Sequence, residues 1–298
     1  MYPRPFHYHR AASVEEAVSL LKQWGEEARL LAGGQSLIPL MKLRLASPRH
    51  LVDLNFVPHL SYAKKDDGAL RFGALTRHAE IEASPVAAQV PLLHDCASGI
   101  ADVQVRNRGT LGGSLAEADP GGDWVPVLLT LGARVTCVGP EGERTVALAD
   151  FITDAYTTVL QPAEVLREIT VPVPAPRSGG AYLALKRSAP VYATASAAVQ
   201  LTLADQDTCR EVGIALGAVG LTAVRAKEAE AALRGKPLTP HAIQAAAEAA
   251  AAASDPQSDM RGSAAYKRAV VAELVKRALD VAWRRARGQP VEGSHLYA

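Results

Sequence analysis

The spacing of apolar residues in the first part of the chain predicts alternating helices and strands. Apolar residues at helical spacing follow Ser13 and Glu16, which form a capping-box pattern, and Gly25 ends this helix. Short apolar runs at 28–32 and 50–54 are typical of strands. This repeated change of period indicates an α/β or α+β unit.

From about Leu70 onward the strand patterns become more frequent. The sequence Gly139-Pro140-Glu141-Gly142 separates two of these patterns and is a hairpin signal. The predicted strands cover 70–74, 134–138, 144–148 and 164–173. The predicted helices begin at Thr76, cover much of 86–98, and cover 123–131.

Proline residues mark the best candidate for a domain boundary. Pro172, Pro174 and Pro176 are followed by Ser178-Gly179-Gly180, a run that is typical of a linker. The strands predicted beyond it cover 182–186, 195–204 and 212–217. The helices predicted after them cover 223–233, 241–253 and 263–287.

The composition excludes several classes of protein. The 298 residues carry a formal net charge of +1, which gives no sign of a nucleic-acid-binding surface. No apolar run reaches the roughly 20 residues that span a bilayer, and the start lacks the apolar segment of a secretory signal. Three widely separated cysteines form neither a disulfide framework nor a closely spaced metal site. We therefore expect a cytoplasmic protein.

Two short glycine turns carry the clearest chemical signal. They are Ala32-Gly33-Gly34-Gln35-Ser36 and Thr110-Leu111-Gly112-Gly113-Ser114, and each is followed by residues that can begin a helix, with Ser36 placed to cap the first one. Glycine lets a backbone approach a ligand closely, so that several N–H groups converge on an anion. Two such turns predict a ligand with two adjacent phosphates, held from both sides, which we interpret as the pyrophosphate of FAD.

Each candidate feature also has a purely structural explanation. The first turn alone could serve as a strand-to-helix connection. The basic run 106–108 fits positive potential near phosphates and equally an ion-paired surface. Asp123 fits a helix cap as well as a contact to a ribose hydroxyl. Tyr192 fits a ring stacked on a flavin and equally a half-buried residue at a strand edge.

Side chains for acid–base or metal chemistry are sparse. None of the eight histidines forms a metal-ligand pair at i, i+4. The chain also lacks Gly-x-Gly-x-x-Gly, Gly-Lys-Ser/Thr and the Gly-x-Ser-x-Gly elbow. The residues predict a cradle for a reactive cofactor, with substrate chemistry left to a partner.

Segments spread along essentially the whole chain match one family in order. They lie at 6–8, 32–39, 51–54, 104–116, 118–120, 164–166, 192–195 and 217–219. At these segments the chain resembles the FAD-binding medium subunit of molybdenum hydroxylases. This family includes the medium subunits of carbon monoxide dehydrogenase and quinoline oxidoreductase and the flavin domain of xanthine dehydrogenase.

The resemblance implies an α+β fold with two domains. A two-lobed FAD-binding domain of the vanillyl-alcohol oxidase (PCMH) type is expected over 1–177, with lobes of about 1–55 and 56–177. A smaller C-terminal domain of the CO dehydrogenase flavoprotein type is expected over 178–298, as a three-stranded sheet with helices.

The resemblance also implies a set of FAD contacts. The two glycine turns would hold the pyrophosphate, Asp123 would lie near the ribose or adenine, and Tyr192 would lie against the isoalloxazine. The implied cofactor-binding residues are Ala32, Gly33, Gly34, Gln35, Ser36, Leu37, Ile100, Ala101, Thr110, Gly112, Gly113, Ser114, Asp123, Leu166, Lys186 and Tyr192.

The chain departs from the family pattern at three positions. Gln35 stands where many relatives have histidine, which excludes a histidyl-linked flavin there, so FAD is expected to be non-covalent. Glu117 stands where a close subset has histidine, and Val191 replaces an acidic residue that often precedes the tyrosine. The extra cluster-binding cysteines of the benzoyl-CoA reductase branch are absent.

The function that the resemblance implies is electron transfer within a complex. Substrate would be oxidised at a molybdenum cofactor in a large subunit, and electrons would pass through [2Fe–2S] clusters of a small subunit to this FAD and on to an external acceptor. A dimer of heterotrimers is expected. The alternatives are a self-sufficient FAD oxidase and a scaffold subunit that has lost flavin.

Overall fold

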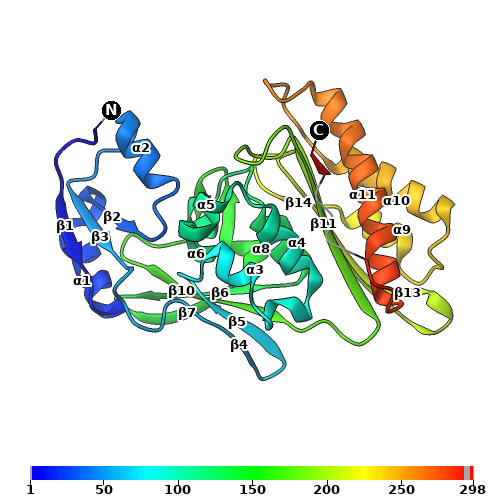
Figure 1. Ribbon diagram of the computed structural model, residues 1–298, viewed down its shortest axis with the longest axis horizontal. Coiled ribbons are helices and arrows are strands. Elements are labelled where there is room, and N and C mark those ends of the chain that lie inside the picture. The colour runs from blue at the N-terminus through cyan, green and yellow to red at the C-terminus, as the bar shows by residue number, and fades with distance from the viewer. Residues whose placement is uncertain (1, 292–295, 298) are drawn as a thin grey trace.

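The computed structural model describes residues 2–291 and 296–297, and it shows three units in a row along the long axis (Figure 1). We call them the N-terminal lobe (β1 to β3), the middle lobe (β4 to β10) and the C-terminal unit (β11 to β15). Each unit has its own main sheet, and three clusters of buried apolar residues form the core. The α+β organisation is confirmed. His295 lies outside the described residues.

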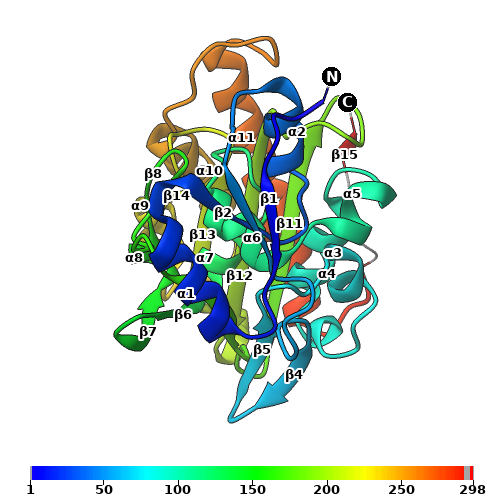
Figure 2. The same cartoon turned by 90° about the vertical axis from the view of Figure 1, so that its left-hand side faces the viewer.

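The N-terminal lobe is a parallel sheet of order β1-β3-β2 with α1 beside it (Figure 2). Ser13 caps α1 as predicted, because its hydroxyl accepts a hydrogen bond from the Glu16 N–H at 3.1 Å. Gly25 ends α1 in the left-handed region at φ +51°. The elements are β1 (His7–Arg10), α1 (Val14–Trp24), β2 (Ala28–Leu31), α2 (Leu37–Leu43) and β3 (His50–Asp53).

The middle lobe is a five-stranded sheet of order β4-β5-β10-β6-β7, with helices packed beside it. Its main strands are β4 (Ala63–Asp66), β5 (Ala69–Gly73), β6 (Arg134–Gly139), β7 (Gly142–Ala147) and β10 (Val165–Pro172). A separate two-stranded sheet consists of β8 (Ile152–Asp154) and β9 (Thr157–Thr158). The helices are α3 (His78–Glu82), α4 (Pro91–Gly99), α5 (Val103–Arg108), α6 (Leu111–Glu117), α7 (Trp124–Thr130) and α8 (Leu148–Phe151).

Two predicted helices of the middle lobe differ from the structure. The single helix predicted over 86–98 is a 3₁₀ turn followed by α4, because Val90 precedes Pro91 and is extended. The helix predicted to begin at Thr76 begins two residues later. The Thr76 hydroxyl donates to the Gly73 carbonyl and accepts from the Tyr62 N–H, so it fastens β5 instead of capping a helix.

The C-terminal unit is built on three long antiparallel strands, β11, β12 and β13, with two-residue strands at the edges. The predicted linker residues 178–180 are the start of β11. A Cβ on Gly179 would lie 2.4 Å from the Ala286 N, so glycine lets α11 pack directly on the strand. The elements are β11 (Ser178–Lys186), β12 (Ala195–Leu203), β13 (Cys209–Gly217), β14 (Val224–Arg225), α9 (Lys227–Leu233), α10 (Pro240–Ala253), α11 (Ala264–Ala286) and β15 (Leu296–Tyr297).

A buried ion pair fastens the C-terminal unit to the middle lobe. Arg285 at the end of α11 binds both carboxylate oxygens of Asp95 on α4, at 2.5 and 3.1 Å. The side chains are 8% and 1% exposed. Arg285 also donates to the Gly180 carbonyl at 2.7 Å. Because the pair is bidentate and shielded from water, it fixes the orientation of α11 and β11 against α4.

Three absences hold for the described part of the chain. No helix there is long and apolar enough to span a membrane. No group of three or more histidine, cysteine or acidic side chains is arranged to hold a metal ion. The three cysteines are free and buried.

Replacing Arg285 tests the importance of this ion pair. We expect Arg285→Ala to lower the free energy of unfolding by about 3–5 kcal/mol, because Asp95 would stay buried without its cation. Arg284→Ala, one residue earlier, removes only an exposed pair with Asp280 and should cost less than about 1 kcal/mol. Urea unfolding of both variants measures the difference, and equal losses would contradict the role assigned to Arg285.

Candidate functional site: a dinucleotide-sized cleft

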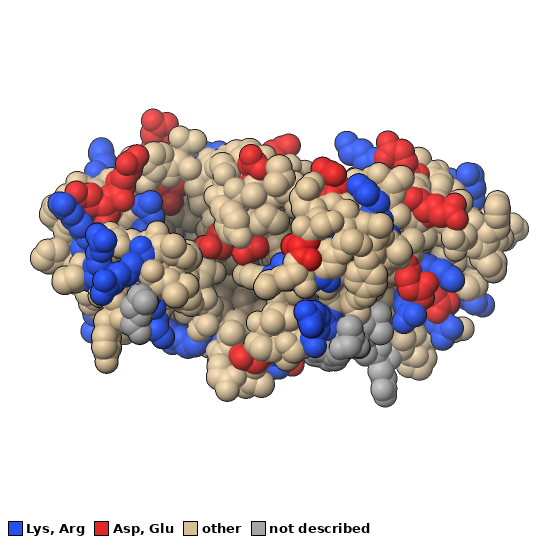
Figure 3. Space-filling model, turned by 90° about the horizontal axis from the view of Figure 1, so that it is seen from above, with Lys and Arg blue, Asp and Glu red and all other residues tan. Residues whose placement is uncertain are grey.

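One cleft of about 770 Å³ lies where the three units meet. Its size falls within the range of roughly 300–1,000 Å³ that is usual for small-molecule and cofactor sites. Figure 3 shows the surface hollowed between the N-terminal lobe and the middle of the molecule. Fifteen of the sixteen predicted site residues line this cleft, and Lys186 does not. The structure therefore gathers residues from widely separated segments, as expected, while contact with a cofactor remains a prediction.

The first loop, residues 32–36, presents free backbone donors. Among the described residues, the N–H groups of 33–37 donate to no protein acceptor. Ser36 occupies the N-cap position of α2, but its hydroxyl caps no N–H, so the predicted cap is wrong. Gly34 has φ +75°, which few other residues adopt. A run of unpaired amides at the start of a helix is suited to binding an anion.

The second loop, residues 110–114, does not present free amides. The N–H groups of Leu111 and Gly112 donate to carbonyls of the β5–α3 connection, Gly112 to Ala74 at 2.8 Å. The Gly113 N–H donates to the Thr110 hydroxyl at 3.1 Å. These residues form the first turn of α6, with Thr110 as its N-cap. The expectation of two equivalent amide-lined loops therefore holds only for the first.

The two loops touch each other at Gly33. A Cβ there would fall on the Arg108 carbonyl oxygen and within 2.8 Å of the Gly109 Cα. Both obstacles are backbone, so no side-chain rotation could relieve the overlap. Glycine is needed at this position for the approach of two backbones. The sequence alone predicts a different use of this glycine, the close approach of a ligand.

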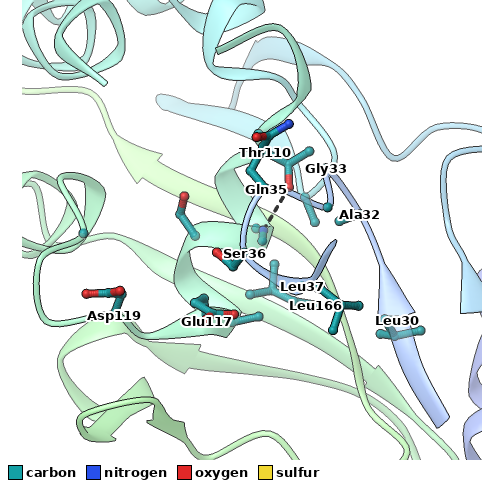
Figure 4. Close-up of a pocket in the computed structure, with 18 of the residues that line it drawn as sticks. Leu30, Ala32, Gly33, Gln35, Ser36, Leu37, Thr110, Glu117, Asp119 and Leu166 are labelled. Carbon is teal, nitrogen blue, oxygen red and sulfur yellow. Dashed lines mark hydrogen bonds between the residues drawn. The ribbon is translucent and has the colours of Figure 1, made fainter. Parts of the chain in front are cut away.

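Two side chains that the sequence argument missed hold this contact together (Figure 4 shows the loop region). Asn55 donates from Nδ2 to the Ala32 carbonyl at 2.9 Å. Arg77 donates to the Arg108 carbonyl and to the Asn55 Oδ1. Asn55 follows β3 and Arg77 precedes α3, so the bridge ties the N-terminal lobe to the second loop. Neither residue stands out in the sequence because each donates to a partner at least 22 positions away.

Arg106 has a structural role in the loop that carries Ile100 and Ala101. Its Nη1 donates to the carbonyls of both residues, at 3.1 and 3.4 Å, and its Nε pairs with Glu82 at 3.0 Å. Ala101 is held in the left-handed region at φ +42°. Of the two interpretations of the basic run, the ion-paired one therefore applies to Arg106.

Asp123 and Lys186 form a buried pair behind the cleft wall. The Lys186 Nζ lies 3.0 Å from the Asp123 Oδ2 and 2.8 Å from the Gly99 carbonyl. The other Asp123 oxygen accepts the Tyr182 hydroxyl. Asp123 does not cap α7 with its side chain, although it occupies the N-cap position. Lys186 does not line the cleft, but it holds Asp123 and the Gly99 carbonyl in place behind the cleft wall.

Tyr192 lies at one end of the cleft beside two carboxylates. It is 42% exposed, and a Cβ on Gly121 would lie 3.1 Å from its ring. Burial and the neighbouring Asp119 raise the pKa of its phenol. Asp119 accepts from the Tyr156 hydroxyl at 3.1 Å. Both interpretations of Tyr192 remain compatible with this placement, because its ring is half-buried and still faces the cleft.

His78 is a buried neutral imidazole behind the second loop. The Trp124 Nε1 donates to the His78 Nδ1 at 3.1 Å. The backbone N–H of His78 donates to the Gly109 carbonyl. Burial, together with Arg77 and Arg106, lowers the pKa of His78 to about 4. A Cβ on Gly109 would lie 2.6 Å from the imidazole Nε2, so the ring packs closely on the backbone of this segment.

Comparisons with known families cover almost the whole chain. Residues 4–174 match the family described as the FAD binding domain in molybdopterin dehydrogenase. Residues 180–282 match the family described as the CO dehydrogenase flavoprotein C-terminal domain.

Known proteins with these domains are similar in sequence and structure. The carbon monoxide dehydrogenase medium chain of Hydrogenophaga pseudoflava is 44% identical over 96% of this chain and 99% of its own. A solved structure of that organism's carbon monoxide dehydrogenase, lacking the Mo-pyranopterin moiety, superposes with a TM-score of 0.93, at 46% identity over 96% and 99% of the two chains. Quinoline 2-oxidoreductase from Pseudomonas putida 86 gives 0.91, at 36% identity over 96% and 99%.

The glycine at the loop contact can be tested by binding. We expect Gly33→Ala to raise the FAD dissociation constant about tenfold to hundredfold, roughly 1.4–2.8 kcal/mol, because the methyl group must separate the two loops. Gly68→Ala is the control, since it adds the same group at φ +72° in a turn with open space around it. Titration of flavin fluorescence measures both. Unchanged affinity in Gly33→Ala would contradict the assigned contact.

The low pKa of His78 predicts an acid-sensitive fold. Its pKa of about 4 lies below the ordinary 6.5, so the unfolded chain binds this proton more readily between those values. Stability is therefore lost as pH falls from 7 toward 4, by up to about 3 kcal/mol. Urea unfolding across this range should show a smaller loss in His78→Gln. The exposed His94→Gln should keep the full loss, and identical pH profiles for both variants would refute the assignment.

Proposed function

The chain belongs to the FAD-binding medium subunits of the molybdenum hydroxylases, and from this premise we propose that it is the electron-transfer flavoprotein of a three-component complex. When bound, FAD supplies the storage of two electrons and their transfer between [2Fe–2S] clusters of a small subunit and an external acceptor. The chain itself binds, orients and shields this cofactor. The domain division at residues 177 and 178 is part of the proposal.

The observation that carries the proposal is the unpaired amide run of the first loop. The N–H groups of 33–37 precede or begin α2, belong to residues that line the cleft, and lack protein acceptors among the described residues. Buried or half-buried donors require partners, and a pyrophosphate supplies several acceptor oxygens. We therefore assign the pyrophosphate to the first loop, with Leu37 alongside. Gln35 carries no nucleophile for a histidyl-type link, so the attachment is non-covalent.

The second loop contributes in a different way from the first. Because its amides bind the β5–α3 connection, we propose that it presents the Ser114 hydroxyl and its small surface to the cofactor. Gly112 lets α6 pack directly on the β5–α3 connection, since a Cβ there would lie 2.7 Å from the Ala74 carbonyl oxygen. We assign the contact with a ribose to the backbone of Asp123, because its carboxylate is buried and held by Tyr182 and Lys186.

The apolar and aromatic surfaces of the cleft suit the two ring systems of FAD. Leu166 and Ile100 line the cleft and are almost fully buried. Tyr192 offers an accessible ring at one end, and we assign the isoalloxazine to it because a redox group needs access to its electron donor and acceptor. Ala101 lies on the loop that Arg106 holds in place.

Partners are proposed from the names of similar proteins. Several are called medium chains or medium subunits, including the medium subunit of nicotine 6-hydroxylase from Paenarthrobacter nicotinovorans. We propose a large subunit with the molybdenum cofactor, a small subunit with [2Fe–2S] clusters, and a dimer of such heterotrimers in the cytoplasm. The substrate pocket belongs to the large subunit in this proposal.

Purification of the native complex tests the function. We expect this chain to co-purify with two other subunits and to yield about one FAD per chain, together with molybdenum and iron. A yellow chain without these partners, reduced directly by a small organic substrate, would favour the self-sufficient oxidase. A colourless chain that stays colourless with added FAD would favour the scaffold, and either result would overturn the proposal.

A further inference from the structure

The acids that line the cleft are Glu26, Glu117, Asp119, Asp123 and Glu164, and two of them are paired with cations. The Glu164 carboxylate is bound by Arg144 at 2.6 and 2.7 Å, and Asp123 is bound by Lys186. Arg29 donates to backbone carbonyls near the opposite end. The remaining acids near Tyr192 are Glu117 and Asp119, and neither forms an ion pair within the described residues.

Glu117 is the less satisfied of these two acids. It ends α6, lines the cleft, and its side chain has no hydrogen-bond partner among the residues that the structure describes. Burial and the nearby Asp119 raise its pKa. Asp119 accepts hydrogen bonds from the Gly121 N–H and the Tyr156 hydroxyl, which are neutral donors. The titratable groups that face Glu117 are Asp119, Tyr156 and Tyr192. The cation Arg261 interacts electrostatically with Tyr156, but its guanidinium is already paired with Asp259 at 3.5 Å.

This acidic pair lies at the Tyr192 end of the cleft. Figure 4 shows Asp119 and Leu30 at opposite ends, with the first loop between them. If the first loop holds the pyrophosphate, the two ring systems must lie on either side of it. Tyr192, which interacts electrostatically with both acids, marks the end that we assign to the isoalloxazine.

We propose that Glu117 and Asp119 select the electron acceptor by charge, so that the flavin is reoxidised by neutral or cationic molecules and anionic ones are disfavoured. This rests on the proposed function. A net negative charge beside a cleft repels anions on approach and lowers their association rate. A nicotinamide dinucleotide, with its negatively charged pyrophosphate, is disfavoured as an acceptor on the same ground. Neutral quinones are favoured.

Reoxidation of the full FAD-loaded chain by two acceptors tests the proposal. After anaerobic chemical reduction, each two-electron-reduced FAD gives one electron to each of two ferricyanide trianions, or two electrons with two protons to one neutral benzoquinone. We expect the ratio of the benzoquinone to the ferricyanide rate constant to fall about tenfold in the double variant Glu117→Gln, Asp119→Asn. Added salt should reduce the same ratio in the unmodified chain, because it screens the acids.

A control variant distinguishes the effect of charge beside the cleft from the effect of the protein's net charge. Glu141→Gln makes the same kind of charge change on the exposed β6–β7 hairpin and should leave the ratio unchanged. The FAD midpoint potential gives a second readout, and it should rise in Glu117→Gln but not in Glu141→Gln, because removing a nearby negative charge stabilises the more negative reduced form.

The outcomes also separate this proposal from the proposed function. FAD bound with normal affinity, but with the same acceptor ratio and potential in all variants, would overturn the charge selection alone. Failure of the unmodified chain to bind FAD would overturn the proposed function and this inference with it.

Discussion

The contact between two backbones at Gly33 is the constraint on which the cleft depends. The first loop can lie against Arg108 and Gly109 only because position 33 has no side chain. This contact fixes the distance between the N-terminal lobe and the start of α6. The free amides of the first loop then face a wall whose own amides are already bonded inside the protein. The contact at Gly33 and the bonds of Asn55 and Arg77 hold the two loops against each other without a ligand, and pre-organisation of this kind lowers the entropy cost of binding.

The C-terminal unit acts on the cleft although most of it lies elsewhere. Its strand β11 carries Lys186, which binds the Gly99 carbonyl and Asp123 on the middle lobe. Its helix α11 carries Arg285, which binds Asp95 in the same helix that ends at Gly99. Two buried cations from one unit therefore hold both the body and the end of α4. These contacts therefore also fix the start of the loop after α4, which carries Ile100 and Ala101.

Local patterns predict most of the elements and the two glycine loops of the cleft, while the resemblance supplies further lining residues such as Ile100 and Leu166. Apolar spacing located most helices and strands, and the glycine turns marked both loops. The contacts that decide how the loops behave are not local. The amides of Leu111 and Gly112 are used by carbonyls more than 30 positions earlier, and Asn55 and Arg77 act through partners on other segments. Gly179 reads as part of a domain boundary in the sequence, and its role in packing is hidden because the residues of α11 that lie on it follow about 100 positions later.

Arg29 lines the cleft, and other cations close to it bind groups of the protein itself. Arg77, Arg106, Arg144 and Lys186 all lie close to the lining, and each binds carbonyl oxygens or carboxylates of the protein itself. Positive charge thus stands one layer behind the surface and holds the loops in shape. The surface itself offers neutral N–H groups at the first loop and uncompensated carboxylates near Tyr192. In the proposed complex, the phosphates bind the N–H dipoles of the first loop, whose positions are set by the fold. Glu117 and Asp119, near Tyr192, then act on molecules that approach the cleft from solvent.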